Sequence, residues 1–227
     1  QLLASHGFTT LALAYFGLEG LASHLEKIPL EIIQEAIDYL KKSPYADSIR
    51  LGLYGRSKGA EFALLAASHY ADFKCLVLNS PSYLCLEGLK QWRNSKTSSW
   101  TYQGQELPYH PFLWKDFFQR LIFKKDLKNI NHQAVIPVEK INGSLLLLVS
   151  KKDEVWDAYG SAITIVNRLQ QKRFKYPYQV ESYENCGHMM TVAYQPNHRY
   201  KKVALEKIMA DTNDSWQKTL AFFRNRL

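Results

Sequence analysis

Residues Gly55-Arg56-Ser57-Lys58-Gly59 decide the fold, because of what stands on either side of them. The largely apolar run at 49–54 that precedes them is typical of a buried strand. The run at 60–67 that follows them is rich in residues that favour helices. A strand, the pattern G-x-S-x-G and a helix, in that order, predict a nucleophile elbow, a sharp turn that exposes the serine hydroxyl. The two glycines leave room for the backbone in so tight a turn, and the alternative is a Gly-rich turn with a solvated serine.

The length and composition are those of an ordinary globular domain. With 227 residues, 46% of them hydrophobic and 22% charged, the chain can form one α/β domain with a single core. No apolar run reaches the roughly 18–20 residues that a membrane span requires. Three cysteines without metal-site spacing lead us to expect neither a metal site nor a disulfide framework: Cys75, Cys85 and Cys186. The net charge of +8 would suit anionic partners, but the Lys and Arg are scattered, so we expect a solvated basic surface and no nucleic-acid partner.

Strands and helices alternate along most of the chain. Besides the elbow, the pattern predicts an opening helix that Gly7 ends, a strand at 8–16, a helix at 29–40, strands at 75–78, 144–149 and 178–183, a helix with Tyr159, Ala162, Ile163, Val166 and Leu169 on one face, and a last helix that begins near Asp214. This alternation predicts a mostly parallel sheet with helices on both faces. The chain starts at Gln1 inside a helix-like segment, and we therefore expect it to be N-terminally truncated and to lack its first strands.

Residues 84–137 interrupt this alternation with an aromatic and irregular stretch. We interpret the stretch as an insertion in a single catalytic domain that spans residues 1–227. Within it, the segment 112–123 has four apolar residues near helical spacing, with basic residues between them: Trp114, Phe117, Phe118 and Leu121. This segment either lines a pocket for an apolar ligand or packs as a helix over the edge of the sheet, and the sequence leaves both interpretations open.

Three residues that follow predicted strands have the order of a hydrolytic triad. Ser57, Asp153 and His188 each stand just after the carboxyl end of a strand, where open α/β sheets build their sites. In an α/β-hydrolase the order along the chain is serine, acid, histidine. Glu154 and Asp157 are rival acids, because an Asp after a strand is often only a turn or capping residue. The sequence therefore predicts an α/β-hydrolase fold with Ser57, Asp153 and His188 as its catalytic residues.

Each of these residue types suits one step of acyl transfer. A serine hydroxyl is a poor nucleophile at neutral pH, so His188 would remove the proton from Ser57 and later donate it to the leaving group. Asp153 would accept a hydrogen bond from the other imidazole nitrogen. The backbone N–H of Lys58 would stabilise the oxyanion, and we expect the second donor to lie upstream of Gln1. Nine other residues lack the placement or the order that the site requires: His6, His24, His69, His110, His132, His198, Glu206, Asp211 and Asp214.

Several segments resemble the acyl-CoA thioesterase / bile acid-CoA:amino acid N-acyltransferase family. The segment HGFTTLALAYF at 6–16 and the elbow at 55–61 carry most of the resemblance, which spans nearly the whole chain. Segments 28–31, 153–156 and 187–188 are similar to the family's helix, acid loop and histidine turn. The resemblance implies a Ser/Asp/His or Cys/Asp/His triad that acts on acyl-CoA thioesters, and an N-terminal β-sandwich ahead of the catalytic domain. It also implies hydrolysis where the nucleophile is Ser, and transfer to glycine or taurine where it is Cys.

The predicted nucleophile, Ser57, favours hydrolysis. We expect a thioesterase that converts fatty acyl-CoA to a free fatty acid and CoA through an acyl-serine, without a cofactor. The alternatives among enzymes are a carboxylesterase or serine peptidase of the same fold, and an acyl-CoA:amino acid N-acyltransferase. The alternative from another class is a catalytically silent domain that binds a lipid or a partner. Residues 224–227 are not a peroxisomal address, so we expect a cytoplasmic protein and leave mitochondria open; the sequence does not indicate the oligomeric state.

Overall fold

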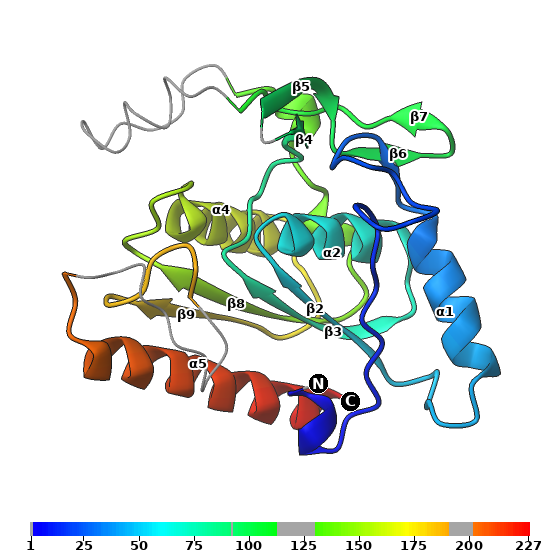
Figure 1. The fold of residues 1–227 in the computed structure, drawn as a ribbon. Helices are drawn as coiled ribbons and strands as arrows, with labels where there is room; N and C mark the ends of the chain where they lie inside the picture. The colour runs from blue at the N-terminus through cyan, green and yellow to red at the C-terminus, as the bar shows by residue number, and fades with distance from the viewer. Residues whose placement is uncertain (1, 92, 113–129, 191–201) are drawn as a thin grey trace. The chain divides into compact units, whose positions relative to one another are not determined.

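The computed structural model describes residues 2–91, 93–112, 130–190 and 202–227 of the chain (Figure 1). The chain forms two compact units, each built from two stretches of sequence. One, which we call the sheet unit, contains Ile49–Tyr83 and Pro137–Leu227. The other, which we call the hairpin unit, contains Gln1–Ser48 and Leu84–Ile136. All three residues of the predicted triad belong to the sheet unit.

The sheet unit contains a four-stranded parallel sheet. Its strands lie in the order β2 (Leu51–Arg56), β3 (Phe73–Asn79), β8 (Ser144–Ser150) and β9 (Tyr178–Tyr183). The apolar β8 is buried along its full length, as is typical of a strand that is covered on both faces. Because all neighbouring strands are parallel, their carboxyl ends meet at one edge of the sheet.

Helices cover both faces of this sheet. α2 (Lys58–His69) and α4 (Ala158–Gln171) lie on one face, and α5 (Leu205–Arg226) lies on the other (Figure 1). Two glycines in β2 show how closely these layers approach. A Cβ on Gly52 would lie 2.9 Å from the ring of Phe223 in α5, while a Cβ on Gly55 would lie 2.8 Å from Ala60 in α2. Residues three apart in a strand point to opposite faces, so β2 contacts a helix on each side.

The hairpin unit is built from short elements. β1 (Ile28–Pro29), β6 (Trp100–Tyr102) and β7 (Gln105–Glu106) form a three-stranded sheet, β4 (Glu87–Lys90) and β5 (Arg93–Ser98) form an antiparallel hairpin, and α1 (Ile32–Lys42) follows β1. The unit also contains the 3₁₀ turns η1 (Ala4–His6) and η2 (His132–Ala134), while a third, η3 (Val138–Lys140), precedes β8 in the sheet unit. The buried carboxylate of Glu87 accepts hydrogen bonds from the N–H groups of Lys96 and Phe112, so one acidic side chain holds the hairpin to the chain beside it.

The structure confirms the expected parallel sheet with helices on both faces. The strands predicted at 49–54, 75–78, 144–149 and 178–183 are β2, β3, β8 and β9, and their ends differ from the prediction by no more than two residues. The helix predicted after the elbow is α2, and the helix predicted at 29–40 is α1, which begins three residues later because residues 28–29 pair with β6. Cys75 is fully buried in β3.

The strand predicted at 8–16 is wrong. These residues form no strand and are largely exposed. An apolar segment becomes a strand only where a neighbour supplies ladder hydrogen bonds, and no strand of the described chain pairs with this one. The opening helix is likewise only the 3₁₀ turn η1, which Gly7 ends in the left-handed conformation at φ 90°.

The start predicted for the last helix is also wrong. α5 begins at Leu205 rather than near Asp214, because Ile208 and Thr212 are already buried against the core. Among the described helices, none combines the length and the apolar composition that a membrane span requires.

In α4 the predicted apolar face is partly wrong, since Tyr159 and Ile163 are exposed. Its buried residues are Ala158, Ser161, Ala162, Ile165 and Leu169. The helix predicted at 112–123 lies, apart from its first residue, outside the described residues.

Candidate active site

Ser57 occupies a sharp turn between β2 and α2 that leaves no room for a side chain at Gly55. A Cβ on Gly55 would lie 2.6 Å from the carbonyl carbon of Gly59. Ser57 itself has φ 56° and ψ −124°, a conformation that costs about 1–3 kcal/mol for a residue with a side chain. Its N–H donates to the carbonyl of Asn79 in β3 at 2.9 Å, which fixes the turn against the neighbouring strand. The Ser57 side chain makes no capping bond to α2, so its hydroxyl is available to another partner.

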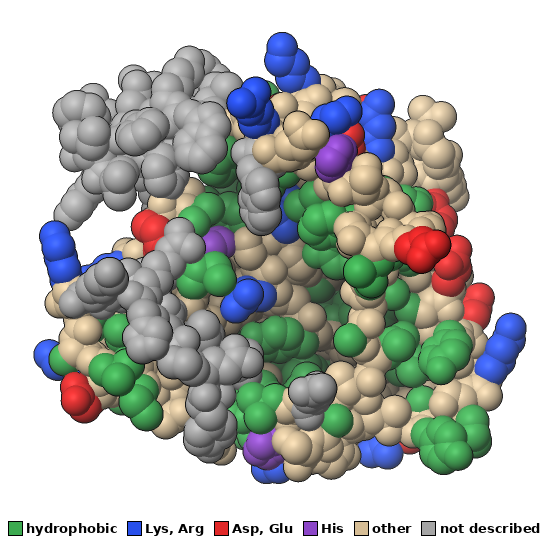
Figure 2. All heavy atoms as spheres, in the orientation of Figure 1, with side chains coloured by type: hydrophobic (Ala, Val, Ile, Leu, Met, Phe, Trp, Pro, Cys, Tyr) green, Lys and Arg blue, Asp and Glu red, His purple; other side chains and the backbone are tan. Residues whose placement is uncertain are grey.

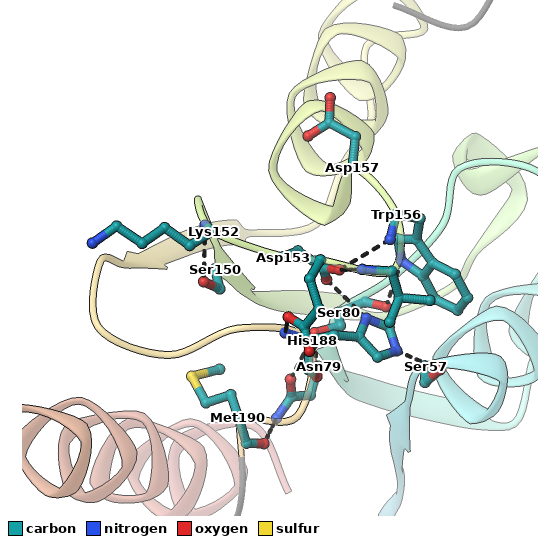
Figure 3. Close-up of polar contacts among 12 residues, drawn as sticks. Ser57, Asn79, Ser80, Ser150, Lys152, Asp153, Trp156, Asp157, His188 and Met190 are labelled. Atoms are coloured by element: carbon teal, nitrogen blue, oxygen red, sulfur yellow. Dashed lines mark hydrogen bonds and ion pairs between the residues drawn. The ribbon is translucent and has the colours of Figure 1, made fainter. Parts of the chain in front are cut away.

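The three side chains predicted for the site lie in one hydrogen-bonded series (Figure 3). His188 Nε2 lies 2.8 Å from Ser57 Oγ, and His188 Nδ1 lies 2.8 Å from Asp153 Oδ2. The three residues follow β2, β8 and β9, so the series lies at the edge where the parallel strands end. When Nδ1–H donates to the carboxylate, Nε2 is left to accept from the serine hydroxyl. Only 5% of the His188 side chain and 1% of the Asp153 side chain is exposed, so water has little access to the hydrogen bond between them.

The loop after β8 orients the acid. Asp153 Oδ1 accepts hydrogen bonds from the N–H groups of Val155 at 2.9 Å and Trp156 at 3.0 Å. These two bonds hold one carboxylate oxygen within the loop and direct the other toward His188. The ring of Trp156 lies edge-on to the imidazole of His188, with centroids 4.6 Å apart. The same loop therefore supplies both the acid and an aromatic cover for the histidine.

The two rival acids have other contacts. Glu154 Oε2 accepts the backbone N–H of His188 at 2.8 Å, so it holds the main chain of the residue whose ring Asp153 holds. Asp157 caps the start of α4 by accepting the N–H of Gly160 at 2.7 Å. Of the three neighbouring carboxylates, Asp153 is the one bonded to the imidazole.

Lys58 is the first residue of α2, where backbone N–H groups have no acceptor within the helix. Its ammonium group lies 2.8 and 2.7 Å from the two carboxylate oxygens of Glu61, which is fully buried. A buried carboxylate requires such a partner, and the pair also ties the Lys58 side chain down beside the nucleophile. The backbone N–H of Lys58 thus occupies a fixed position next to Ser57.

Four residues of the site were not anticipated from the sequence: Asn79, Ser80, Ser150 and Trp156. Asn79 donates its side-chain amide to the carbonyl of Met190 at 3.2 Å, and Ser80 Oγ donates to the carbonyl of His188 at the same distance. Ser150 Oγ donates to the carbonyl of Cys186. All three follow or end a strand, as Ser57 does, so the rule that located the triad would have found them had it been applied to every polar residue at a strand end.

The described histidine and acids of the sheet unit that the sequence set aside have other positions and contacts. His69 donates from Nδ1 to the carbonyl of Leu65 at 2.8 Å within α2. His6, His24, His110 and His132 belong to the hairpin unit, and His198 lies outside the described residues. Asp211 accepts from the N–H of Asn185, Asp214 accepts from the hydroxyl of Tyr183, and Glu206 stands in the first turn of α5.

Burial makes two of the three thiols unreactive. Desolvation raises the pKa of Cys75 to about 12. Desolvation, with a smaller contribution from Asp211, raises the pKa of Cys186 to about 12 as well. A thiol attacks as its thiolate, and these two stay protonated at neutral pH. The hydroxyl of Ser57, with an imidazole at hydrogen-bonding distance, is therefore the better candidate nucleophile in the sheet unit.

The described residues offer no competing site built around a metal. They contain no group of three or more His, Cys, Asp or Glu that could hold a metal ion. On the face drawn in Figure 2, the coloured Lys and Arg side chains are spread among other side chains rather than joined in one continuous surface.

The chain matches a protein family along most of its length. A family model described as "BAAT / Acyl-CoA thioester hydrolase C terminal" matches residues 28–227. The chain is 30% identical over 205 residues to acyl-coenzyme A amino acid N-acyltransferase 2 of Mus musculus, with 86% of this chain and 46% of the relative covered. It is 28% identical over 247 residues to acyl-coenzyme A thioesterase 1 of Homo sapiens, with 100% of this chain and 56% of the relative covered. The chain thus spans about half the length of the curated relatives it matches.

A solved structure supports the fold class. The acylaminoacyl peptidase of Pyrococcus horikoshii matches 87% of this chain, and 27% of its own, with a TM-score of 0.53 and 14% identity. At this identity the likeness shows the fold alone, which is the α/β-hydrolase fold predicted from the sequence.

Proposed function

Because the chain belongs to the BAAT / acyl-CoA thioester hydrolase C-terminal family, we propose that it hydrolyses fatty acyl-CoA through an acyl-enzyme on Ser57. Its relatives include acyl-CoA thioesterases and acyl-CoA amino acid N-acyltransferases, which makes an acyl-CoA thioester the expected substrate. The observation that carries the proposal is the hydrogen-bonded series of Ser57, His188 and Asp153, with 2.8 Å at each step.

The series supports a two-step reaction. His188 Nε2 takes the hydroxyl proton while Ser57 Oγ attacks the thioester carbonyl, and Asp153 stabilises the imidazolium that forms. The resulting oxyanion accepts a hydrogen bond from the N–H of Lys58. When the C–S bond breaks, the imidazolium gives its proton to the departing CoA sulfur and the acyl group remains on Ser57. Water then attacks the acyl-serine with His188 again as base, which releases the fatty acid and restores the hydroxyl.

The identity of the nucleophile favours hydrolysis over transfer to an amine. An acyl group on serine is an oxygen ester, which reacts with amines far more slowly than the thioester that a cysteine would form. The buried thiol of the histidine turn, Cys186, has a raised pKa and its Sγ contacts the carbonyl of Ile208, so it does not serve as an acyl carrier. Acyl transfer to an amino acid remains the second candidate because two relatives are named as such transferases.

The test measures CoA release from palmitoyl-CoA by the unmodified chain and by Ser57→Ala. We expect the variant to lose about 10⁴-fold or more in kcat, with an unchanged melting temperature. The assay is repeated with glycine or taurine present, and N-acyl product is measured by mass spectrometry. Retention of activity in Ser57→Ala would refute the acyl-serine, and N-acyl product in excess of free acid would replace hydrolysis by transfer.

The preferred substrate distinguishes a thioesterase from an esterase or a peptidase of the same fold. Faster turnover of p-nitrophenyl esters than of palmitoyl-CoA would indicate an esterase, and faster turnover of peptides would indicate a peptidase. A fluorophosphonate probe that leaves Ser57 unlabelled would indicate a catalytically silent binding domain.

A further inference from the structure

We propose that Glu154 and Ser80 act as positioning residues that hold the backbone of His188 from both sides; we call this pair the backbone clamp. The inference rests on the proposed function, because it assigns a role in aligning the general base. It adds two residues that touch neither the serine hydroxyl nor the ring nitrogens of His188.

The clamp follows from the hydrogen bonds of one residue. The ring of His188 is bonded through Nδ1 to Asp153 and through Nε2 to Ser57, at 2.8 Å each. Its backbone N–H donates to Glu154 Oε2 at 2.8 Å. Its carbonyl accepts from Ser80 Oγ at 3.2 Å (Figure 3). Two side chains from different loops therefore fix the main chain, while the other two contacts fix the ring. When the backbone of His188 is fixed, few side-chain rotamers place its ring within hydrogen-bonding distance of Ser57. The clamp therefore helps to align the imidazole with the serine hydroxyl.

Ser80 has the strained backbone that is typical of functional positions. It is fully buried at the end of β3, and its φ of 50° lies in the left-handed region that non-glycine residues avoid. This conformation is held by the N–H of Ser80, which donates to the carbonyl of Leu148 at 2.9 Å, and by its carbonyl, which accepts the indole N–H of Trp156 at 3.2 Å. The Ser80 hydroxyl has a second acceptor, Asn79 Oδ1, at 3.3 Å, and its single proton is shared between this oxygen and the carbonyl of His188.

Trp156 connects the two arms of the clamp. It follows Glu154 in the loop after β8, and its indole N–H reaches the carbonyl of Ser80 at the end of β3. The edge-on contact between Trp156 and the His188 ring covers part of the imidazole that the clamp does not touch. Hydrogen bonds thus join three segments to one another: the loop after β8, the end of β3 and the histidine turn.

A purely structural role makes a different prediction from a positioning role. Structural residues change the melting temperature and leave the reactivity of the folded protein as it was. Positioning residues lower the reactivity of Ser57 in protein that remains folded. The rate of Ser57 labelling by a fluorophosphonate probe, measured beside the melting temperature, separates the two and does not require a thioester substrate.

The decisive variants are Ser80→Ala, Glu154→Ala and Glu154→Gln. We expect each alanine variant to slow labelling by about tenfold, the equivalent of one hydrogen bond in the alignment of the base. Glu154→Gln should stay within about threefold of the unmodified chain, because an amide oxygen also accepts a backbone N–H. The matched control is Ser215→Ala, which removes a buried hydroxyl that bonds within α5 and should leave the labelling rate unchanged.

A second readout follows the imidazole itself. The low-field proton resonance of His188 Nδ1–H should weaken or broaden in Glu154→Ala and persist in Glu154→Gln. If Ser80→Ala does not fold, Trp156→Phe tests the same arm, since it keeps an aromatic ring and removes the indole N–H, and we expect about a fivefold slower labelling. Alanine variants that label at the unmodified rate with an intact resonance would overturn the clamp. Normal labelling of the unmodified chain without CoA release would instead overturn the proposed thioesterase while leaving the clamp in place.

Discussion

The turn that carries Ser57 and the two loops that carry Asp153 and His188 are held in different ways. At the elbow, backbone packs on backbone, and a single Cβ at Gly55 would lie 2.6 Å from the carbonyl carbon of Gly59. At the acid loop and the histidine turn, polar side chains hold the backbone, as in the contact of Glu154 with the N–H of His188. Backbone packing and a main-chain hydrogen bond thus fix the nucleophile, while hydrogen bonds to side chains fix its two partners. Substitutions at the elbow should therefore damage the fold, and substitutions in the loops should damage alignment.

The largest expected effect in the loops comes from Asp153→Asn. The amide keeps the shape of the acid but removes the charge that stabilises the imidazolium and selects its tautomer, so we expect kcat to fall by about 10³–10⁴-fold. The fold should survive, because the Asn carbonyl still accepts the N–H groups of Val155 and Trp156. The check is kcat for palmitoyl-CoA beside the melting temperature. The carboxylate of Asp157 caps the start of α4. An equal loss of kcat in Asp157→Asn would contradict the choice of Asp153 over Asp157 as the acid of the site.

At the elbow the decisive substitution is Gly55→Ala. Its Cβ meets backbone that has no space to move, so the free energy of unfolding should fall by about 3 kcal/mol. The matched control is Gly104→Ala, where nothing lies within 4 Å of the added Cβ but φ is +72°. This control should lose only about 1 kcal/mol, from the backbone conformation alone. Denaturant titration measures both, and similar losses would mean that the elbow is not fixed by packing.

The two buried thiols report how often each region opens locally to solvent. Cys75 lies in β3, the strand that pairs with the strand leading into the elbow, and Cys186 lies in the histidine turn. Burial raises the pKa of each to about 12, so at pH 8 only about one thiol in 10⁴ is ionised in the folded state. The unfolded thiols ionise near pH 9 and the folded ones near pH 12. Burial of the protonated thiols therefore costs no stability below pH 9, and the full loss of stability is reached at about pH 12. The folded state is therefore progressively destabilised as the pH rises from 9 toward 12.

We expect iodoacetamide at pH 8 to alkylate Cys186 about tenfold faster than Cys75, since polar loops open locally more often than a central strand. Peptide mapping after timed quenching gives both rates, and denatured protein supplies the reference. Equal rates in the native protein would mean that the histidine turn and the sheet open together.

The smallest expected effect comes from Tyr183→Phe. The hydroxyl of this last residue of β9 donates to Asp214 at 2.9 Å, and burial together with that contact raises the pKa of Tyr183, so the phenol keeps its proton at neutral pH. Loss of the hydroxyl should cost about 1 kcal/mol of unfolding free energy and leave kcat unchanged, because Asp214 still pairs with Lys218 at 2.7 Å. Tyr178→Phe at the other end of β9 is the control. A fall in kcat for Tyr183→Phe would show that the histidine turn depends on α5.

The sequence predicted best where local pattern and long-range packing agree. The apolar runs that became β2, β3 and β8 end at glycine, polar or turn residues, and each has a parallel neighbour in the sheet. The same apolar signal failed at 8–16, because a single sequence does not show whether a partner strand exists. Asp214 resembles a helix start by local chemistry, yet it lies inside α5, since packing of Ile208 extends the helix toward its N-terminus.

The catalytic residues of the proposed site were predictable from the sequence, but the residues that hold them in place were not. Chain order and position after strands were sufficient to select Ser57, Asp153 and His188, which the structure brings together. The sequence left Glu154 as a rival to Asp153, because the two are adjacent and differ only in which atoms of His188 they reach. Ser80 went unnoticed, since its role depends on a histidine turn more than a hundred positions away in the chain. The catalytic assignment and the cytoplasmic location stay predictions until they are measured.

The edge-on contact of Trp156 with His188 gives the protein an optical reporter of its own base. An imidazolium quenches the emission of a nearby indole more strongly than neutral imidazole does, and these two rings have centroids only 4.6 Å apart. The difference in emission between the unmodified chain and Trp156→Phe isolates this one fluorophore from the other tryptophans. Stopped-flow fluorescence would then follow proton transfer during a single turnover without any added dye.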